Sequence, residues 1–284
     1  MIAFNGQYLP AASHGNMRIT AACLGGQWVI DNRYMTPATQ QAIIAAFGAE
    51  EGIAVISRTN DYLNALAITD TTRALQLAMF IQEDPLLVTS LVETSKTRWL
   101  VGDGKAYVDT GVVPGGRKLA TKSKFYINGT NTTWATMVGS GVRDNTDNYR
   151  PICKNTSTNQ WRLKIGGYNT YYPNADNQPH TVEVNTPQGM FIYDGEVLDS
   201  TTQRSVPASN TRSLWIFDDN GGGGNNATGG CAYVQITEQE DIAHFIPYNN
   251  GTECGMLDII SGTFYPNANA QGSFTIAITD KTHA

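Results

Sequence analysis

The first ~95 residues place apolar side chains at helical spacing. Thr36 and Pro37 form an N-cap followed by a first-turn proline, and Gly48 is a typical helix stop. Between them, one side of the predicted helix carries Ala42, Ile43, Ala46 and Phe47. Similar signals predict a second helix over 70–82 and a third over 86–93, whereas residues 17–30 and 52–57 resemble strands in their β-branched and apolar content. Residues 1–97 are therefore expected to form a small α+β module.

From about residue 99 the pattern changes to short apolar or alternating runs separated by turns. The runs cover 105–113, 124–127, 134–138, 161–165, 180–185, 189–193, 213–217, 231–237 and 273–278. Asn128-Gly129 and Asp194-Gly195 are typical turn pairs between such runs. Because helix signals are rare here, residues 98–284 are expected to form a mostly β, antiparallel sandwich or barrel, with the junction near 95–102.

Composition and charge exclude several classes of protein. The chain has 284 residues, of which 41% are hydrophobic and only 15% charged, and its net charge is −6. An acidic protein of this kind does not suit the phosphate backbone of nucleic acids. No apolar run approaches the ~18 residues of a membrane span, and the start of the chain lacks the basic and apolar regions of a secretory signal. We therefore expect neither nucleic acid nor membrane as a partner.

The cysteines and histidines give little evidence of redox or metal chemistry. The four cysteines form no CxxC pair, and the four histidines are scattered. Free or buried thiols are the simplest interpretation, and a disulfide between Cys231 and Cys254 is the alternative.

The end of the chain carries a recognisable series of motifs. Apolar strands at 214–217 and 231–236 precede His244-Phe245-Ile246-Pro247, and a strand-like segment at 106–111 opens the region. The series continues with Gly255-Met256-Leu257-Asp258, Gly262-Thr263-Phe264-Tyr265-Pro266-Asn267 and Gly272-Ser273-Phe274-Thr275. This pattern resembles concanavalin-A-like (LamG-type) jelly-roll modules, which are common in tailed-phage and gut-bacterial surface proteins. The chain departs from it by Met256-Leu257, where Leu-Tyr is usual, and by an insert before Gly272.

Hydrolytic relatives of such modules need two carboxylates that flank a sugar bond. The nearest set here is Asp194, Glu196 and Asp199, but the Asp194-Gly195 turn should splay these side chains apart. The glycine run at 221–224 opens no helix and lacks the Lys-Ser/Thr of a phosphate loop. We therefore expect no enzyme activity, and a glucanase or lyase is kept as a minor alternative.

Two sets of residues are candidates for binding. Asp218, Asp219 and Asn220 could ligate Ca²⁺ through oxygen atoms, as could the stretch 144–148, although both sequences are also common in solvated turns. Apart from calcium, no cofactor is expected. Sugar recognition favours aromatic rings beside amides and carboxylates, which suggests a glycan platform of Trp161, Tyr168, Tyr171 and Tyr172 with Asp218 and Asn220 as polar partners. The alternative is that these rings fill the core or a subunit contact.

The resemblance and the uncharged surface favour a structural protein of a tailed-phage virion: a fibre, a spike or a decoration subunit on head or tail. The N-terminal module would attach to other virion proteins, and the jelly roll would face outward, where it could bind a glycan of the host surface. Such a protein would be assembled in the host cytoplasm and would form a homo-oligomer. The second hypothesis is a bacterial carbohydrate-binding adhesin, which would require export.

Overall fold

The chain divides into two compact units, Met1–Lys96 and Thr97–Ala284. The computed structural model describes residues 34–130, 134–141, 148–172, 176–200, 205–220 and 226–281, and the backbone of six short strands before residue 30. These strands pair two by two and antiparallel. They are β1 (Ile2–Phe4), β2 (Gln7–Leu9), β3 (Ser13–His14), β4 (Met17–Arg18), β5 (Ala22–Leu24) and β6 (Gln27–Val29).

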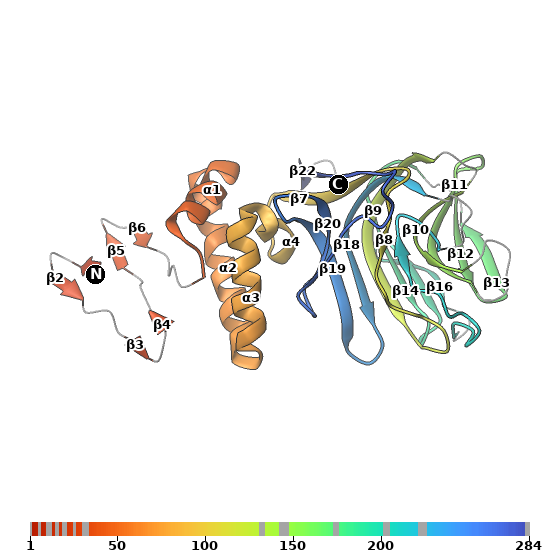
Figure 1. Cartoon of the computed structure of the whole chain (residues 1–284), viewed down its shortest axis with the longest axis horizontal. Helices are drawn as coiled ribbons and strands as arrows, with labels where there is room; N and C mark the ends of the chain where they lie inside the picture. Colours follow the sequence, from red (N-terminus) through yellow and green to blue (C-terminus); the bar gives the residue numbers. More distant parts are fainter. Residues whose placement is uncertain are drawn as a thin grey trace. The chain divides into compact units, whose positions relative to one another are not determined.

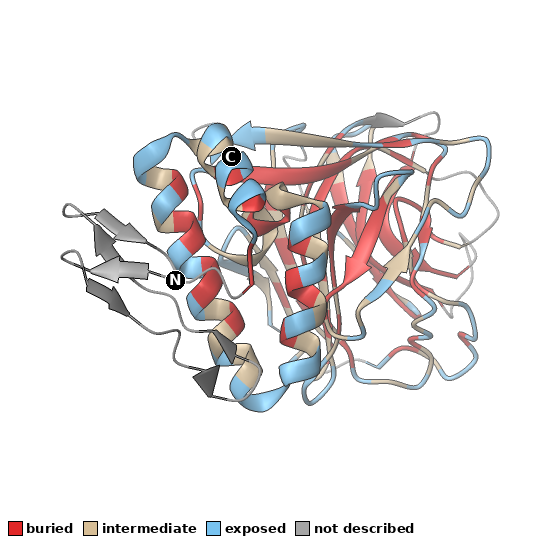
Figure 2. Ribbon diagram, turned by 60° about the vertical axis from the view of Figure 1, so that its left-hand side comes forward, coloured by how far each residue is buried: buried red, intermediate tan, exposed pale blue. Residues whose placement is uncertain are grey.

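Helices make up the rest of the first unit. They are α1 (Pro37–Phe47), α2 (Ala49–Thr69), α3 (Thr71–Glu83), the 3₁₀ turn η1 (Pro85–Leu87) and α4 (Val88–Leu91). The predicted N-caps are confirmed: the Thr39 amide donates to Thr36 Oγ1 at 3.2 Å, and the Arg73 amide donates to Asp70 Oδ1 at 2.9 Å. The helices are buried along one side and exposed along the other (Figure 2).

The strand predicted at 52–57 is wrong, because this segment lies inside α2. Its β-branched residues belong to a helical pattern that continues beyond 57, since α2 buries Gly52, Ile56, Thr59 and Leu63 along one face. Gly52 itself lies against α1: a Cβ atom there would be 2.7 Å from the Cα of Ile44. Helix packing therefore outweighs the strand preference of single residues.

The second unit is a sandwich of two antiparallel sheets (Figure 1). The order in the six-stranded sheet is β13 (Tyr168–Tyr172), β12 (Gln160–Ile165), β11 (Tyr149–Asn155), β10 (Trp134–Ser140), β17 (Trp215–Ile216) and β8 (Val108–Asp109). The ten-stranded sheet runs β16 (Glu196–Asp199), β15 (Met190–Tyr193), β14 (His180–Asn185), β9 (Ala120–Thr130), β18 (Ala227–Thr237), β19 (Asp241–Asn249), β20 (Cys254–Asp258) and β21 (Thr263–Tyr265). In the latter sheet β7 (Lys96–Asp103) also pairs with β18, and β22 (Phe274–Asp280) pairs with β7.

The hydrophobic core lies between these sheets. The ten-stranded sheet contributes Phe125, Val182 and Val234, and the six-stranded sheet contributes Met137 and Leu163. Strand β14 alternates between buried and half-buried residues, as expected of a strand with only one face on the core. The predicted fold class, a mostly β, jelly-roll-type antiparallel sandwich after a small N-terminal module that contains helices, is confirmed.

The three cysteines in the described part of the chain, Cys153, Cys231 and Cys254, form no disulfide, so the alternative of a disulfide between Cys231 and Cys254 is wrong. Burial raises the pKa of Cys153 and of Cys231, which keeps both thiols protonated and unreactive. None of the helices in the described residues is long and apolar enough to span a bilayer.

Candidate functional site

Trp161, the first residue of the predicted glycan platform, lies in the core on the inner face of β12. Its side chain is only 3% exposed and meets Phe125 edge to face, with ring centroids 5.5 Å apart. Its Nε1 donates to Tyr193 Oη at 3.0 Å, which satisfies the buried indole. A ring in this position fills the sandwich and presents no face to a sugar.

Tyr168 and Tyr172 also face inward, at the β13 edge of the sandwich. Both hydroxyls donate to Asp199 Oδ2, that of Tyr172 at 3.3 Å, and the Tyr172 ring stacks on Phe191 with centroids 4.6 Å apart. Burial raises the pKa of both tyrosines, and the Asp199 carboxylate adds to the effect. These contacts close the edge of the sandwich. Three of the four predicted rings therefore belong to the core, as the alternative interpretation held, rather than to a glycan platform.

Tyr171 alone of the four points to the outer face of the six-stranded sheet. Its register partner is Arg162 on β12, and side chains alternate along both strands. The exposed fraction of Tyr171 is 43%, the largest among the tyrosines of the described residues. This residue therefore marks the part of the predicted platform that a ligand can reach.

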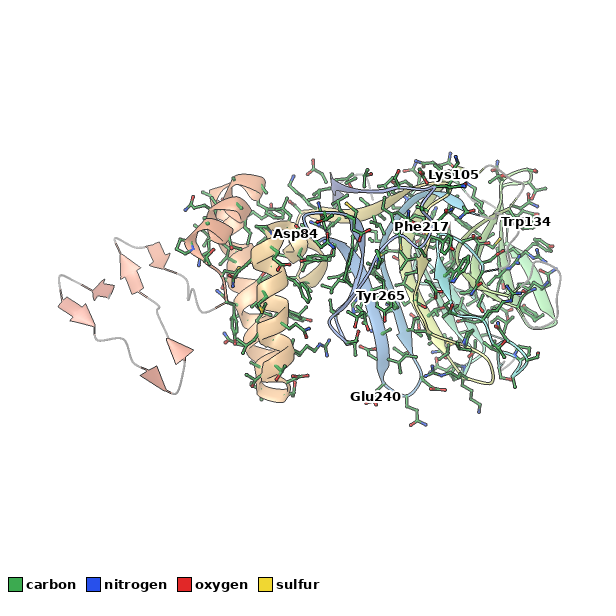
Figure 3. All side chains as sticks on the ribbon, viewed as in Figure 1. Asp84, Lys105, Trp134, Phe217, Glu240 and Tyr265 are labelled. Atoms are coloured by element: carbon green, nitrogen blue, oxygen red, sulfur yellow. The ribbon has the colours of Figure 1, made fainter. Side chains whose placement is uncertain are left out.

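Arg162 packs against two aromatic rings, whose centroids lie 6.2 Å apart. Its Cζ atom lies 4.7 Å from the ring centroid of Trp134 and 5.8 Å from that of Tyr171. Its Nε donates to Asn169 Oδ1 at 2.7 Å, and Asn169 Nδ2 donates to Tyr171 Oη at 3.3 Å. We call these four residues the Arg162 cluster. Trp134, labelled in Figure 3, stands on β10 beside the green strands β11 to β13.

The outer face around this cluster is polar and yet buried. All seven residues of β10 are buried, as are six of the seven in β11 and five of the six in β12, so these strands are covered on both faces. The inner positions are mainly apolar, and the outer positions include Thr136, Arg150, Cys153 and Lys164. The outer face of this sheet is therefore polar but little exposed to solvent, whereas the outer face of β14 is half-exposed.

A second polar group lies on the same face, at the turn after β17. Asp219 Oδ2 and Arg150 Nη2 form an ion pair at 2.8 Å, with both side chains fully buried. Asp218 Oδ1 accepts from the Asp219 amide at 2.7 Å. Burial, reinforced by the charge of Asp219, raises the pKa of Asp218 to about 7. Phe217 and Asn220, with φ of 72° and 53°, hold this turn in a conformation that non-glycine residues rarely adopt.

The predicted calcium ligands are already engaged by protein groups. Asp219 is paired with Arg150, and Asn220 Nδ2 donates to the Ser213 carbonyl at 3.0 Å. Among the described residues no group of three or more His, Cys, Asp or Glu side chains could hold a metal ion. The other oxygen-rich stretch, 144–148, lies outside the described residues except for Asn148.

Asp218 and Asn220 are too far along the sheet to act as polar partners of Tyr171. Four strand spacings separate β13 from β17 in the sheet order, which corresponds to roughly 19 Å. The sequence therefore predicted one platform where the structure has two separate polar groups. Trp134 and Arg162 were missed, although the alternation of Arg162 and Lys164 with Trp161, Leu163 and Ile165 could have shown which side chains face outward.

Two of the three carboxylates considered for hydrolysis have a structural partner. Asp194 Oδ2 lies 2.7 Å from His180 Nδ1, while Asp176 Oδ1 lies 2.7 Å from His180 Nε2. Asp199 accepts from the two tyrosines described above, and Glu196 is exposed beyond the turn. A hollow of about 670 Å³ beside Asp194, on the ten-stranded sheet, is lined by Lys122, Lys124 and Glu183 among others. Lys122 and Glu183 form an ion pair there at 3.8 Å.

Comparisons with known proteins identify no family. No protein-family model and no curated protein sequence matches the chain. Solved structures with similarity include a protein from Bacteroides ovatus assigned to carbohydrate binding, with 14% identity, a TM-score of 0.43 and coverage of 66% of this chain and 60% of that one. Domains LG4-5 of the mouse laminin alpha1 chain are 11% identical, with a TM-score of 0.34 and coverage of 54% of this chain and 44% of that one. The enzymatically active domain of tailspike protein 2 from bacteriophage CBA120 is 13% identical, with a TM-score of 0.35 and coverage of 47% of this chain and 24% of that one.

The chain thus spans less than two thirds of the length of each of these structures. Similarity at this level establishes no shared activity, and the fold assignment rests on the strand order and pairing described above.

Proposed function

We propose that this chain is a non-enzymatic structural subunit of a tailed-phage virion whose sandwich binds a glycan on the host surface. The observation that carries the proposal is the Arg162 cluster on the outer face of the six-stranded sheet. The N-terminal unit would attach the subunit to the particle.

The cluster has the chemistry that sugar recognition needs. The apolar C–H face of a pyranose can pack on the exposed ring of Tyr171, while the amide of Asn169 and the guanidinium of Arg162 can bond to hydroxyl groups. Because Arg162 is already held by two rings and by Asn169, little side-chain freedom is lost when a ligand binds. A single site of this kind binds weakly, and several copies in a virion would raise the avidity.

The attachment role is supported by the first unit. Its helices expose large apolar side chains, namely Ile68 at 87%, Met79 at 61% and Leu75 at 52%. Exposed apolar groups on one unit suit a contact with another virion protein or with a second copy of the chain. The resemblance of the C-terminal motifs to modules of tailed-phage surface proteins supports the same setting.

Binding to an array of bacterial surface polysaccharides, compared between the wild type and Tyr171→Ala, tests the glycan part. Loss of the exposed ring should weaken binding about 3-fold to 10-fold, while the melting temperature stays within about 2 °C. Val197→Ala on β16, another exposed apolar position, is the control and should bind like the wild type.

Two outcomes would contradict the proposal. Equal binding by Tyr171→Ala and wild type would place any glycan site elsewhere, and a chain that binds nothing on the array would remove the glycan role. Copy number in purified particles separates a virion subunit from a bacterial adhesin, since only the former is present at fixed stoichiometry.

A further inference from the structure

The charges on the outer face of the six-stranded sheet are unevenly distributed. Arg150, Arg162 and Lys164 all project from this face of β11 and β12, since Arg150 pairs with Lys164 in register and Arg162 lies two residues before it. The buried carboxylates of this face, Asp218 and Asp219, lie at the β17 end, where Asp219 neutralises Arg150. Among the described residues, Arg162 and Lys164 therefore lie at the β12 end of this face, away from the Asp218 and Asp219 carboxylates, although the whole chain carries a net charge of −6.

Arg162 has no carboxylate partner within the part of the chain that the structure describes. Its polar contact there is Nε to Asn169 Oδ1, a neutral acceptor at 2.7 Å. Arg162 as a whole residue is only 8% exposed, and its guanidinium packs against the rings of Trp134 and Tyr171. A cation in such surroundings interacts more strongly with an anion than a cation on an open surface does.

We infer that the Arg162 cluster recognises the carboxylate of an acidic sugar, such as a uronic or sialic acid in a bacterial surface polysaccharide. This inference rests on the proposed function and specifies its ligand class. The Nη1 and Nη2 atoms of Arg162 form the planar pair of donors that matches a carboxylate. Asn169 occupies Nε and fixes the plane of the guanidinium.

Another residue of the cluster contacts the sugar ring. Tyr171 is the exposed member and offers an apolar surface next to the cation, so one pyranose can contact both. A neutral sugar would gain the ring contact and hydrogen bonds through its hydroxyl groups, but no charge-assisted pair with Arg162, which makes the carboxylate the source of specificity.

The experiment compares acids with matched neutral sugars on the full chain. Trigalacturonic acid is titrated against its methyl ester, and 3′-sialyllactose against lactose, by ligand-observed NMR or calorimetry. At least one acid should bind about 10-fold to 100-fold more tightly than its neutral counterpart, as expected for charge-assisted hydrogen bonds. The preference should shrink as the salt concentration rises.

Variants then locate the preference. Arg162→Gln should reduce the binding of the acid to the level of its neutral counterpart, and Arg162→Lys should restore part of the difference. The control is Arg117→Gln, which removes the same charge from an exposed pair with Glu238 and should keep the preference. Asn169→Ala is a second variant at an exposed position and should weaken acid binding while the chain stays folded.

The outcomes distinguish recognition of a carboxylate from glycan binding in general. If the neutral sugars bind as tightly as the acids, or if Arg162→Gln keeps the preference, recognition of a carboxylate is wrong while glycan binding stands. If neither acid binds but the polysaccharide array shows neutral ligands, the result is the same. If no probe and no array polysaccharide binds, glycan binding itself is wrong.

Discussion

At the scale of single residues, Asp218 is a buried carboxyl next to a buried ion pair. Asp218 is 4% exposed as a residue, beside the Arg150–Asp219 ion pair, and burial raises the pKa of its carboxyl to about 7. In the unfolded chain the pKa of this group returns to about 3.9. Between these two values the folded state binds more protons than the unfolded state, so the free energy of unfolding must fall as the pH rises.

Asp218→Asn should therefore flatten the pH dependence of stability. In the wild type the protonated Asp218 causes no penalty below about pH 4, and stability is lost from there through pH 7, at up to about 1.4 kcal/mol per pH unit. The amide of Asn stays neutral throughout, so the variant should melt higher than the wild type near pH 8. Melting temperatures from pH 4 to 8 measure this. Asp109→Asn, an exposed carboxylate on β8, is the control, and equal slopes for Asp218→Asn and wild type would contradict the assignment.

Single residues also show where sequence reasoning reached its limit. Trp161 lies among alternating apolar residues, and this alternation alone places it with Leu163 and Ile165 in the core. Tyr171 is an aromatic residue in a polar stretch, and its outward direction follows from the same alternation. The position of Trp134 over Arg162 could not be predicted, because it depends on β11 being inserted between β10 and β12.

At the scale of elements, the packing of α1 against α2 depends on Gly52. A Cβ atom there would approach the Cα of Ile44 to 2.7 Å and its Cγ1 to 3.1 Å, which requires the two helices to move apart. Alanine has the higher helix propensity by about 1 kcal/mol, and the overpacking penalty of about 1 to 3 kcal/mol opposes this gain.

Gly52→Ala should therefore lower the stability of the helical unit, and Gly52→Val should lower it further. Helix content at 222 nm during a thermal scan of the full chain measures the effect. Gly167→Ala in the β12–β13 turn is the control, because a Cβ atom there meets nothing within 4 Å. If Gly52→Ala raises the melting temperature of the helices, the helix pair is loose enough to absorb the methyl group.

The elements themselves were predictable in unequal measure. The helices with clear caps at Thr36 and Asp70 were found, because a cap is a local interaction. Strands β11 and β13 were missed as separate strands, since Arg150 and Asn169 make their outer faces polar, and Lys154 adds a charged residue on the inner side of β11. Their pairing partners stabilise them as strands, and pairing is not visible in a local window.

At the scale of the whole molecule, each unit has its own packed interior. The residues of the main hydrophobic core extend from Leu100 to Phe274 and all belong to the second unit. An apolar core that is complete within one segment of the chain predicts that the segment folds alone. The helical unit buries its own set, including Ile43, Ile56 and Leu77.

A fragment that begins at Lys96, the first residue of β7, should therefore fold cooperatively and show a β-type circular dichroism spectrum. It should bind the same glycan as the full chain, because every residue of the Arg162 cluster is present. It should not join virus particles, because the exposed apolar helix positions that would attach it are absent.

Copy number in purified particles, compared between the fragment and the full chain, measures the last point. The control is a full-length chain with Ile68→Ser and Met79→Ser, which keeps the helical unit but removes two of its exposed apolar side chains, and it should join particles in reduced number. If the fragment joins at full copy number, attachment belongs to the sandwich. If it fails to fold, the helical unit completes the sandwich and the two units depend on each other.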